Sequence, residues 1–375
     1  MPREDWDAHT LQRRYIGGTP PGERGIFSLR DVNDMQTLPF KGKEWEGEHL
    51  IVWGGSRHTS SAYNFSQYVT ADITYVSTSS KGEVNCDAGM SSALETLCAT
   101  TYQSSHSISM GGYAAGSAQD DIRKLAVASH TLNNSFGTFS WGNRAGAAAM
   151  SDGTYGFFFG GSDGSNLSHR GAWLSMASGG TTTNYGSLNN VGGSTGYGVQ
   201  SMGTAQYPNK SYGITIGGHV QGGQRQDDEI RKINFNRSTS GSVSWATELS
   251  PDRASPCGLQ GSIRFVALGG ETEAGGWQLI ANTSQMHFSN ETLQQDWGDL
   301  SVNNGPKQSG ASSRDKGYLV GGYNYSSSTG YALKEIRRYY PDRGTQTNEA
   351  AWSDFQGGTG SDVYISFTPG VSSAG

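Results

Sequence analysis

The chain has 375 residues, a formal net charge of -6 and an isoelectric point near 5.8. This acidic balance, without any basic run, argues against a duplex nucleic-acid binder, whose affinity comes from Lys and Arg that neutralise phosphates. The 55 Gly, together with 9 Trp, 18 Tyr and 13 Phe, predict an ordered all-β body of short strands joined by many turns.

We expect no secretory signal, because the first residues include Glu4, Asp5 and Asp7 and lack an apolar run. No stretch approaches the length that spans a membrane. The cysteines are too few and too scattered for a disulfide framework, and no CxxC or His/Cys cluster indicates zinc. We therefore expect no membrane insertion, and we expect buried free thiols in a reducing cytoplasm at Cys86, Cys98 and Cys257.

A β-prone run that ends in two glycines recurs along the chain. The first copy is Tyr15-Ile16-Gly17-Gly18, and the first glycines of successive copies are 37, 57, 49, 57, 52 and 52 residues apart. The later copies end at Gly54-Gly55, Gly111-Gly112, Gly160-Gly161, Gly217-Gly218, Gly269-Gly270 and Gly321-Gly322. A period near 50 residues is typical of the blades of a β-propeller.

Two further elements follow the Gly-Gly pairs. The first is a strand with an Ile and basic residues, which is clearest at residues 121–124, 229–232 and 335–338. The second is a Trp about one strand later, at Trp141, Trp245, Trp297 and Trp352. We expect the basic side chains to be solvated or to cover apolar surface with their stems.

Burial explains why such units must occur together. A four-stranded twisted blade cannot hide both of its faces alone, so the apolar strand and the Trp are expected to pack against neighbouring blades. Paired glycines allow positive φ and a close approach of backbones where the strand ends. The sequence therefore predicts an all-β propeller that forms one domain over residues 1–375.

From about Leu50 to Asp362 the pattern resembles the Kelch repeat. That repeat consists of an apolar strand that ends in Gly-Gly, a strand with Tyr or Ile, and then a Trp. The resemblance implies a Kelch-like β-propeller with strands a to d from the inside outward, in which Gly-Gly ends strand b. Residues 362–367 are then an orphan strand a that pairs with residues 15–18 and closes the ring. This count gives seven blades. The short first spacing leaves a six-bladed alternative, in which residues 1–48 are an N-terminal arm or an incomplete first blade.

The longer loops of this meander predict a binding face. Loops from strand b to strand c, and from strand d to the next strand a, emerge on the same side when strands alternate in direction. Aromatic side chains beside Ser, Asn and Gly suit contact with a protein or a glycan. The candidate binding residues are Tyr63, Tyr68, Tyr113, His219, Tyr323 and Tyr325.

No catalytic or cofactor motif is found. Two matches to the hydrolase elbow, at residues 160–164 and 192–196, lack the strand-to-helix setting that the elbow requires. Copper radical oxidases carry a Kelch-like propeller and need two His, two Tyr and a Cys in one pocket, but their extra domains do not fit in 375 residues. The histidines weighed for such a site are His58, His106, His169 and His219. We expect no enzyme, metal or cofactor, with a copper radical oxidase as the least favoured alternative.

Residues 25–32, followed by Lys43-Glu44-Trp45, resemble a segment of tail and appendage proteins from tailed bacteriophages. The resemblance implies a virion structural protein, a tail or fibre component, assembled in multiple copies with other virion proteins in the host bacterial cytoplasm. The propeller would then be a rigid interaction platform. A host-surface glycan-binding adhesin is the alternative.

Overall fold

A computed structural model describes residues 49–374 with gaps, the longest of which are 59–68, 189–197, 301–308 and 356–363. The chain divides into two units, residues 1–41 and 42–375, and every described residue belongs to the second. All regular elements in the described part are β-strands, which confirms the all-β prediction. Residues 1–48, including the Tyr15–Gly18 motif, lie outside the described residues.

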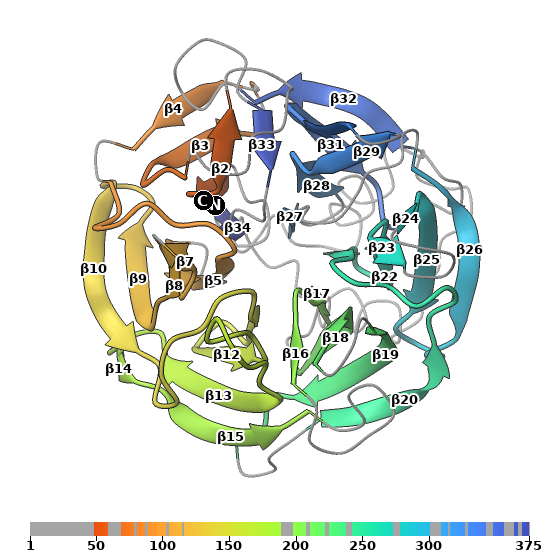
Figure 1. The fold of residues 1–375 in the computed structure, drawn as a ribbon, viewed down its shortest axis with the longest axis horizontal. Helices are drawn as coiled ribbons and strands as arrows, with labels where there is room; N and C mark the ends of the chain where they lie inside the picture. The colour runs from red at the N-terminus through yellow and green to blue at the C-terminus, as the bar shows by residue number, and fades with distance from the viewer. Residues whose placement is uncertain are drawn as a thin grey trace, which may run out of the picture. The chain divides into compact units, whose positions relative to one another are not determined.

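The strands form six main sheets, which are the blades of a β-propeller and are arranged in a ring (Figure 1). From the inside outward, blade 1 contains β34 (Gly370–Ala374), β1 (His49–Trp53), β3 (Ile73–Ser77) and β4 (Glu83–Asn85). Blade 2 contains β5 (Cys98–Tyr102), β6 (His106–Met110), β9 (Asp121–Ala126) and β10 (Thr131–Thr138). Blade 3 contains β11 (Ala148–Ser151), β12 (Tyr155–Phe159), β13 (Arg170–Ser175) and β15 (Thr183–Ser187).

The other three blades have the same order. Blade 4 contains β17 (Gly203–Gln206), β18 (Tyr212–Val220), β19 (Arg225–Asn234) and β20 (Ser242–Glu248). Blade 5 contains β21 (Cys257–Gln260), β22 (Arg264–Leu268), β25 (Asn282–His287) and β26 (Leu293–Asp299). Blade 6 contains β27 (Ser309–Ser313), β28 (Lys316–Val320), β31 (Glu335–Tyr339) and β32 (Asn348–Asp354).

Short strands extend these blades. They are β2 (Ser56–His58), β7 (Tyr113–Ala114), β8 (Ser117–Ala118), β14 (Gly180–Thr181), β16 (Val199–Gln200), β23 (Glu271–Thr272), β24 (Gln278–Leu279), β29 (Tyr323–Ser326), β30 (Thr329–Ala332) and β33 (Tyr364–Ser366). In every blade the strand that leads into Gly-Gly is the second from the centre, as the sequence predicts for strand b.

The ring closes with six blades and not with the seven that the Gly-Gly count favoured. The innermost strands contact one another in the order β34, β5, β11, β17, β21, β27 and back to β34. β34 pairs with β1 from His49↔Ala374 to Trp53↔Gly370 and so supplies strand a of blade 1. The prediction that residues 362–367 close the ring is wrong, because residues 364–366 form β33, which pairs with β2.

Four of the described Gly-Gly pairs join their blade to the loop that leads into the next blade. The first glycine has positive φ, and a Cβ on Gly111 would lie 2.0 Å from the carbonyl oxygen of Arg144 in the loop that leads into the next blade. The second glycine donates its N–H to that same loop, with Gly112 N 2.9 Å from Arg144 O. The equivalent hydrogen bonds run from Gly55 to Leu94, from Gly161 to Val199 and from Gly218 to Arg253, each at 2.8 Å.

This geometry predicts that Gly111→Ala lowers the free energy of unfolding by roughly 2–5 kcal/mol, from the strained φ and the backbone clash together. Gly146→Ala is the matched control, because Gly146 also has positive φ (+66°) but a Cβ there meets no atom closer than 3.4 Å. The control should lose only about 1 kcal/mol. Urea unfolding of both variants measures the difference, and equal losses would show that the close approach of blades is unimportant.

The hydrophobic core consists of six clusters, each shared by two neighbouring blades. In one of them Phe157 of blade 3 stacks on Phe235 of blade 4, with ring centroids 4.6 Å apart. This arrangement confirms that the blades bury their faces against each other. Of the repeated Trp residues, Trp352 is buried and Trp141 and Trp297 are half-buried, while the side chain of Trp245 lies outside the described residues.

Three of the basic residues on strand c are buried, and the expectation of solvated or stem-packed charges is wrong for them. Arg123 and Arg231 have no exposed surface, and Arg337 is 4% exposed. Their carboxylate partners form the pairs Arg123–Asp121 (3.0 Å), Arg231–Asp227 (2.5 Å) and Arg337–Glu335 (3.8 Å). The residue after the Ile faces the preceding blade instead of water, so each guanidinium needs a partner on its own strand.

Candidate functional site

The loops from b to c and from d to a emerge at one end of the ring, which we call the hairpin face. In blades 2, 3 and 5 the loop that enters the blade pairs with the hairpin of that blade, through the bridges Glu95↔Tyr113, Ala145↔Ser162 and Ala254↔Glu271. The bridge Gln119↔Arg144 connects blade 2 to blade 3. β16 pairs with the end of β18 in the same position in blade 4. We call this set of bridges the belt, and it joins these hairpin bases to the ring by backbone pairing.

The predicted binding residues are only partly described. Tyr113 begins β7 and is half-exposed, with its N–H donating to Glu95 O at 2.7 Å. His219 lies in β18 and is half-buried, paired in register with Gln226. The side chains of Tyr323 and Tyr325 in β29, and all of Tyr63 and Tyr68, lie outside the described residues. The structure therefore places Tyr113 and His219 on the hairpin face, in different blades, without bringing them into one site.

The hairpin of blade 3 is the best-defined tip on this face. Asp163 Oδ1 accepts the N–H groups of Ser165 (2.8 Å) and Asn166 (2.7 Å), which folds the tip into a tight turn. The same hydrogen bonds lower the pKa of the Asp163 carboxyl and keep it ionised. The Tyr113 ring from blade 2 lies beside Gly164 at this tip. An aromatic ring of one blade thus lies beside a hairpin tip of the next blade that carries an exposed carboxylate and an exposed amide.

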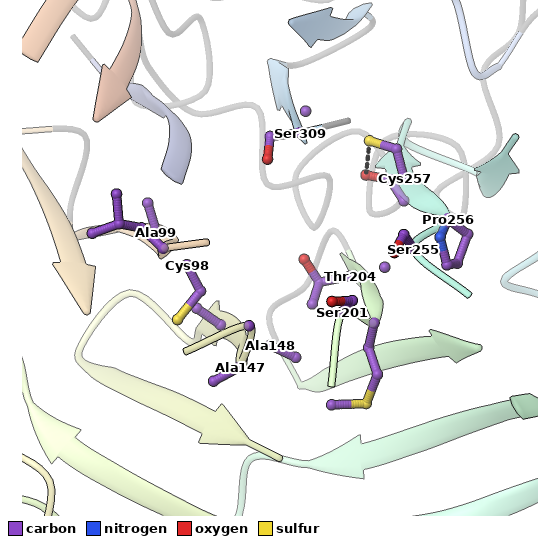
Figure 2. Close-up of a pocket in the computed structure, with 17 residues that line it drawn as sticks. Cys98, Ala99, Ala147, Ala148, Ser201, Thr204, Ser255, Pro256, Cys257 and Ser309 are labelled. Carbon is purple, nitrogen blue, oxygen red and sulfur yellow. Dashed lines mark hydrogen bonds between the residues drawn. The ribbon is translucent and has the colours of Figure 1, made fainter. Parts of the chain in front are cut away.

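The axial channel is lined by the innermost strands. It contains two cavities of about 80 and 110 Å³, which share the wall residues Ala99, Ala149, Thr204, Gly258 and Gly310. Figure 2 shows the first cavity, where the side chains of Thr204 and Ser309 point into the space between the strands. Of the described residues that line either cavity, none is acidic, basic or His.

Two series of hydrogen bonds link neighbouring blades around part of the channel, each across four blades, and we call them the upper ring and the lower ring. At its hairpin end the upper ring is made by backbone groups: Gly146 N donates to Thr96 O (2.8 Å), Ser201 N to Gly146 O (2.8 Å), and Ser255 N to Ser201 O (3.0 Å). All four residues have positive φ, between +52° and +66°. The conformation therefore costs strain at three non-glycine positions, which the repeated hydrogen bonds offset.

At its other end the lower ring uses side chains. Ser151 N donates to Gln206 Oε1 (3.4 Å), Gln206 N to Gln260 Oε1 (2.6 Å) and Gln260 N to Ser312 Oγ (2.8 Å). Each acceptor belongs to the innermost strand of the next blade, so the free inner edge of one strand is satisfied by its neighbour. Sequence reasoning missed both rings, because residues that repeat only once in 50 positions carry no local signal.

The described lining of the channel offers hydroxyl, amide and thiol groups. Burial raises the pKa of both lining thiols, Cys98 and Cys257, to about 12, so they are protonated and poor nucleophiles at neutral pH. All three cysteines are free and buried, as the sequence predicts. In the described part of the chain no three His, Cys, Asp or Glu side chains gather closely enough to hold a metal ion. Nor does that part contain a helix suited to crossing a membrane.

Comparison with known proteins supports the fold and goes no further. No protein-family model matches the chain, and no curated protein matches it. The solved structure of YjhT is similar with a TM-score of 0.62, covering 80% of this chain and 97% of that chain at 11% sequence identity. Identity this low shows a shared architecture alone. The described part of the chain is a β-propeller of six blades.

Proposed function

We propose that the protein is a non-enzymatic structural component of a tailed-bacteriophage virion, a tail or fibre protein that uses its hairpin face to hold another virion protein. The interaction role is supported by the belt, in which backbone pairing joins the loops to the hairpin bases at one end of the ring. Preformed surfaces of this kind bind partners without the entropic cost of ordering loops. The virion assignment is supported by the resemblance of residues 25–32 and 43–45 to phage tail proteins.

The lining of the channel supports a non-enzymatic role. Enzymes need an acid, a base, an activated nucleophile or a metal at the reacting atoms. The described lining supplies hydroxyls, amides and two protonated thiols instead. A propeller that serves as a scaffold needs no catalytic group in its channel, so this lining is consistent with that role.

Quantitative mass spectrometry of purified virions tests the proposal, and the protein should be present at a constant ratio to the tail proteins. Tyr113→Arg on the hairpin face should then reduce the yield of infectious particles at least about tenfold, because it places a charge in the contact. Ile263→Arg is the control, because Ile263 is 47% exposed in the turn between β21 and β22, at the opposite end of the ring. Absence of the chain from virions, or equal effects of the two substitutions, would contradict the proposal.

A glycan-binding adhesin is the second candidate, and the blade 3 tip favours it. The Tyr113 ring beside the exposed Asp163, Ser165 and Asn166 offers stacking and polar contacts that suit a sugar. Binding of host glycans on an array, lost in Tyr113→Ala, would establish this role.

A further inference from the structure

The axial channel carries hydroxyl groups that make no hydrogen bond within the described part of the protein. Thr204 and Ser309 point into the first cavity (Figure 2), and Ser255 also lines it. None of these three hydroxyls has a hydrogen-bond partner among the described residues. Ser255 and Ser309 are only 8% and 9% exposed. A buried hydroxyl without a partner is costly, so these groups indicate a site for a ligand that forms hydrogen bonds.

The second cavity adds two carboxamides whose orientation is fixed by neighbouring blades. Gln206 Oε1 accepts the Ser151 N–H at 3.4 Å, and Gln260 Oε1 accepts the Gln206 N–H at 2.6 Å. Because an N–H needs an acceptor, these contacts place the oxygen of each carboxamide against the neighbouring strand. The two Nε2 groups remain as donors, and no described residue accepts from either of them. Free amide donors and free hydroxyls therefore border adjoining spaces in the channel.

The lining favours an uncharged ligand of small size. None of the described residues that line either cavity is acidic, basic or His, so a bound ion would lie there without a counter-charge. An apolar ligand would leave the hydroxyls and carboxamides of the wall without partners. The cavities measure about 80 and 110 Å³. Because a water-sized group needs roughly 10–15 Å³ of such space, each cavity holds a molecule of roughly five to ten non-hydrogen atoms.

We propose that the axial channel binds a small uncharged polyol, a molecule of the size of glycerol or erythritol. The hydroxyl groups of a polyol both donate and accept, so they can accept from the two free amides and exchange hydrogen bonds with the three free hydroxyls. The described binding residues of the hairpin face line neither cavity, so the inference is independent of the proposed interaction role.

Saturation-transfer NMR of glycerol with the purified full chain tests the proposal. Irradiation of the protein should transfer saturation to glycerol, and a titration of this signal gives the dissociation constant. Erythritol should reduce the transfer, because it competes for the same space. Propan-1-ol and glycerol 3-phosphate are the matched probes, because the first lacks most of the hydroxyls and the second adds charge. Neither of these two should compete with glycerol.

Two double variants locate the binding site. Thr204→Val with Ser309→Ala removes two channel hydroxyls with little change in shape, so glycerol should bind at least about tenfold more weakly. Thr215→Val with Ser109→Ala is the control, because these completely buried residues lie on β18 and β6, the next strands outward, and line neither cavity. Their hydroxyls also lack a partner among the described residues. The control should bind glycerol as tightly as the wild type, and thermal melting should show that both double variants are folded.

Four results would overturn the proposal. They are the absence of saturation transfer to glycerol, competition by either matched probe as strong as that by erythritol, unchanged binding by the channel double variant, and an equal loss of binding in the control. None of these measurements uses another virion component, so their failure would leave the virion assignment standing.

Discussion

Asp227→Asn is expected to lower the free energy of unfolding by about 3–5 kcal/mol, because it leaves a buried guanidinium without its counter-charge. Arg231 Nη1 lies 2.5 Å from Asp227 Oδ2, and Arg231 Nη2 lies 3.0 Å from Asp227 Oδ1. Neither side chain is exposed to solvent. The substitution keeps the shape of the side chain and removes only the charge. Chemical denaturation followed by circular dichroism measures the loss.

The same position in blade 2 provides the control. Arg123 is equally buried, but its partner Asp121 is 39% exposed and makes one contact at 3.0 Å. Water already solvates that carboxylate, so Asp121→Asn should cost less than about 1 kcal/mol. The double variant Asp227→Leu with Arg231→Met should recover most of the stability lost in Asp227→Asn, because a buried pair can be replaced by apolar side chains at little cost. Similar losses from Asp121→Asn and Asp227→Asn would refute the role of burial.

Trp352→Ala is expected to cost about 3–5 kcal/mol, the usual loss for a large aromatic side chain removed from a core. Trp352 is 4% exposed on β32 and meets Tyr318 edge to face, with ring centroids 5.1 Å apart. Its cluster joins blade 6 to Leu50 and Val52 of blade 1, so it is the apolar part of the seam that closes the ring. Differential scanning calorimetry should show a lower melting temperature.

Trp297→Ala is the matched control for Trp352→Ala. Trp297 lies on β26, the equivalent outer strand of blade 5, but it is only half-buried. Less apolar surface returns to water, and we expect a loss of about 1–2 kcal/mol. If Trp297→Ala lowered the free energy of unfolding as much as Trp352→Ala, burial in the seam would not explain the loss at Trp352.

The sequence predicts the repeated unit well and its closure poorly. The Gly-Gly motif reflects a local requirement for positive φ, and both glycines of each described copy meet it. Which strand completes the ring depends on a pairing between residues 49–53 and 370–374, and no local pattern encodes it. Residues 364–366 are more apolar than residues 370–374 and look more like a central strand, yet they pair with β2 instead. The described sheets form six blades, as in the six-bladed alternative, and the favoured count of seven had included the copy at residues 15–18, which lies outside the described residues.

The candidate site was less predictable than the fold. Loop positions followed from strand alternation, which placed Tyr113 and His219 at the correct end of the ring. The burial of Arg231 did not follow, because an alternating strand looks solvated on one face until its neighbour is known. A signal was present, since Asp227 precedes Arg231 by four residues and Asp121 precedes Arg123 by two. Such carboxylates ahead of a basic residue on strand c indicate an internal pair.

The pairing of β34 with β1 has a consequence for the way this chain reaches its native state. His49 must find Ala374 across all of the intervening blades, which is among the most distant contacts in sequence that the ring contains. Contacts of such long range form slowly, because a large loop must first be closed. Until residues 370–374 emerge from the ribosome, β1 therefore holds a bare edge that can recruit a strand from another molecule.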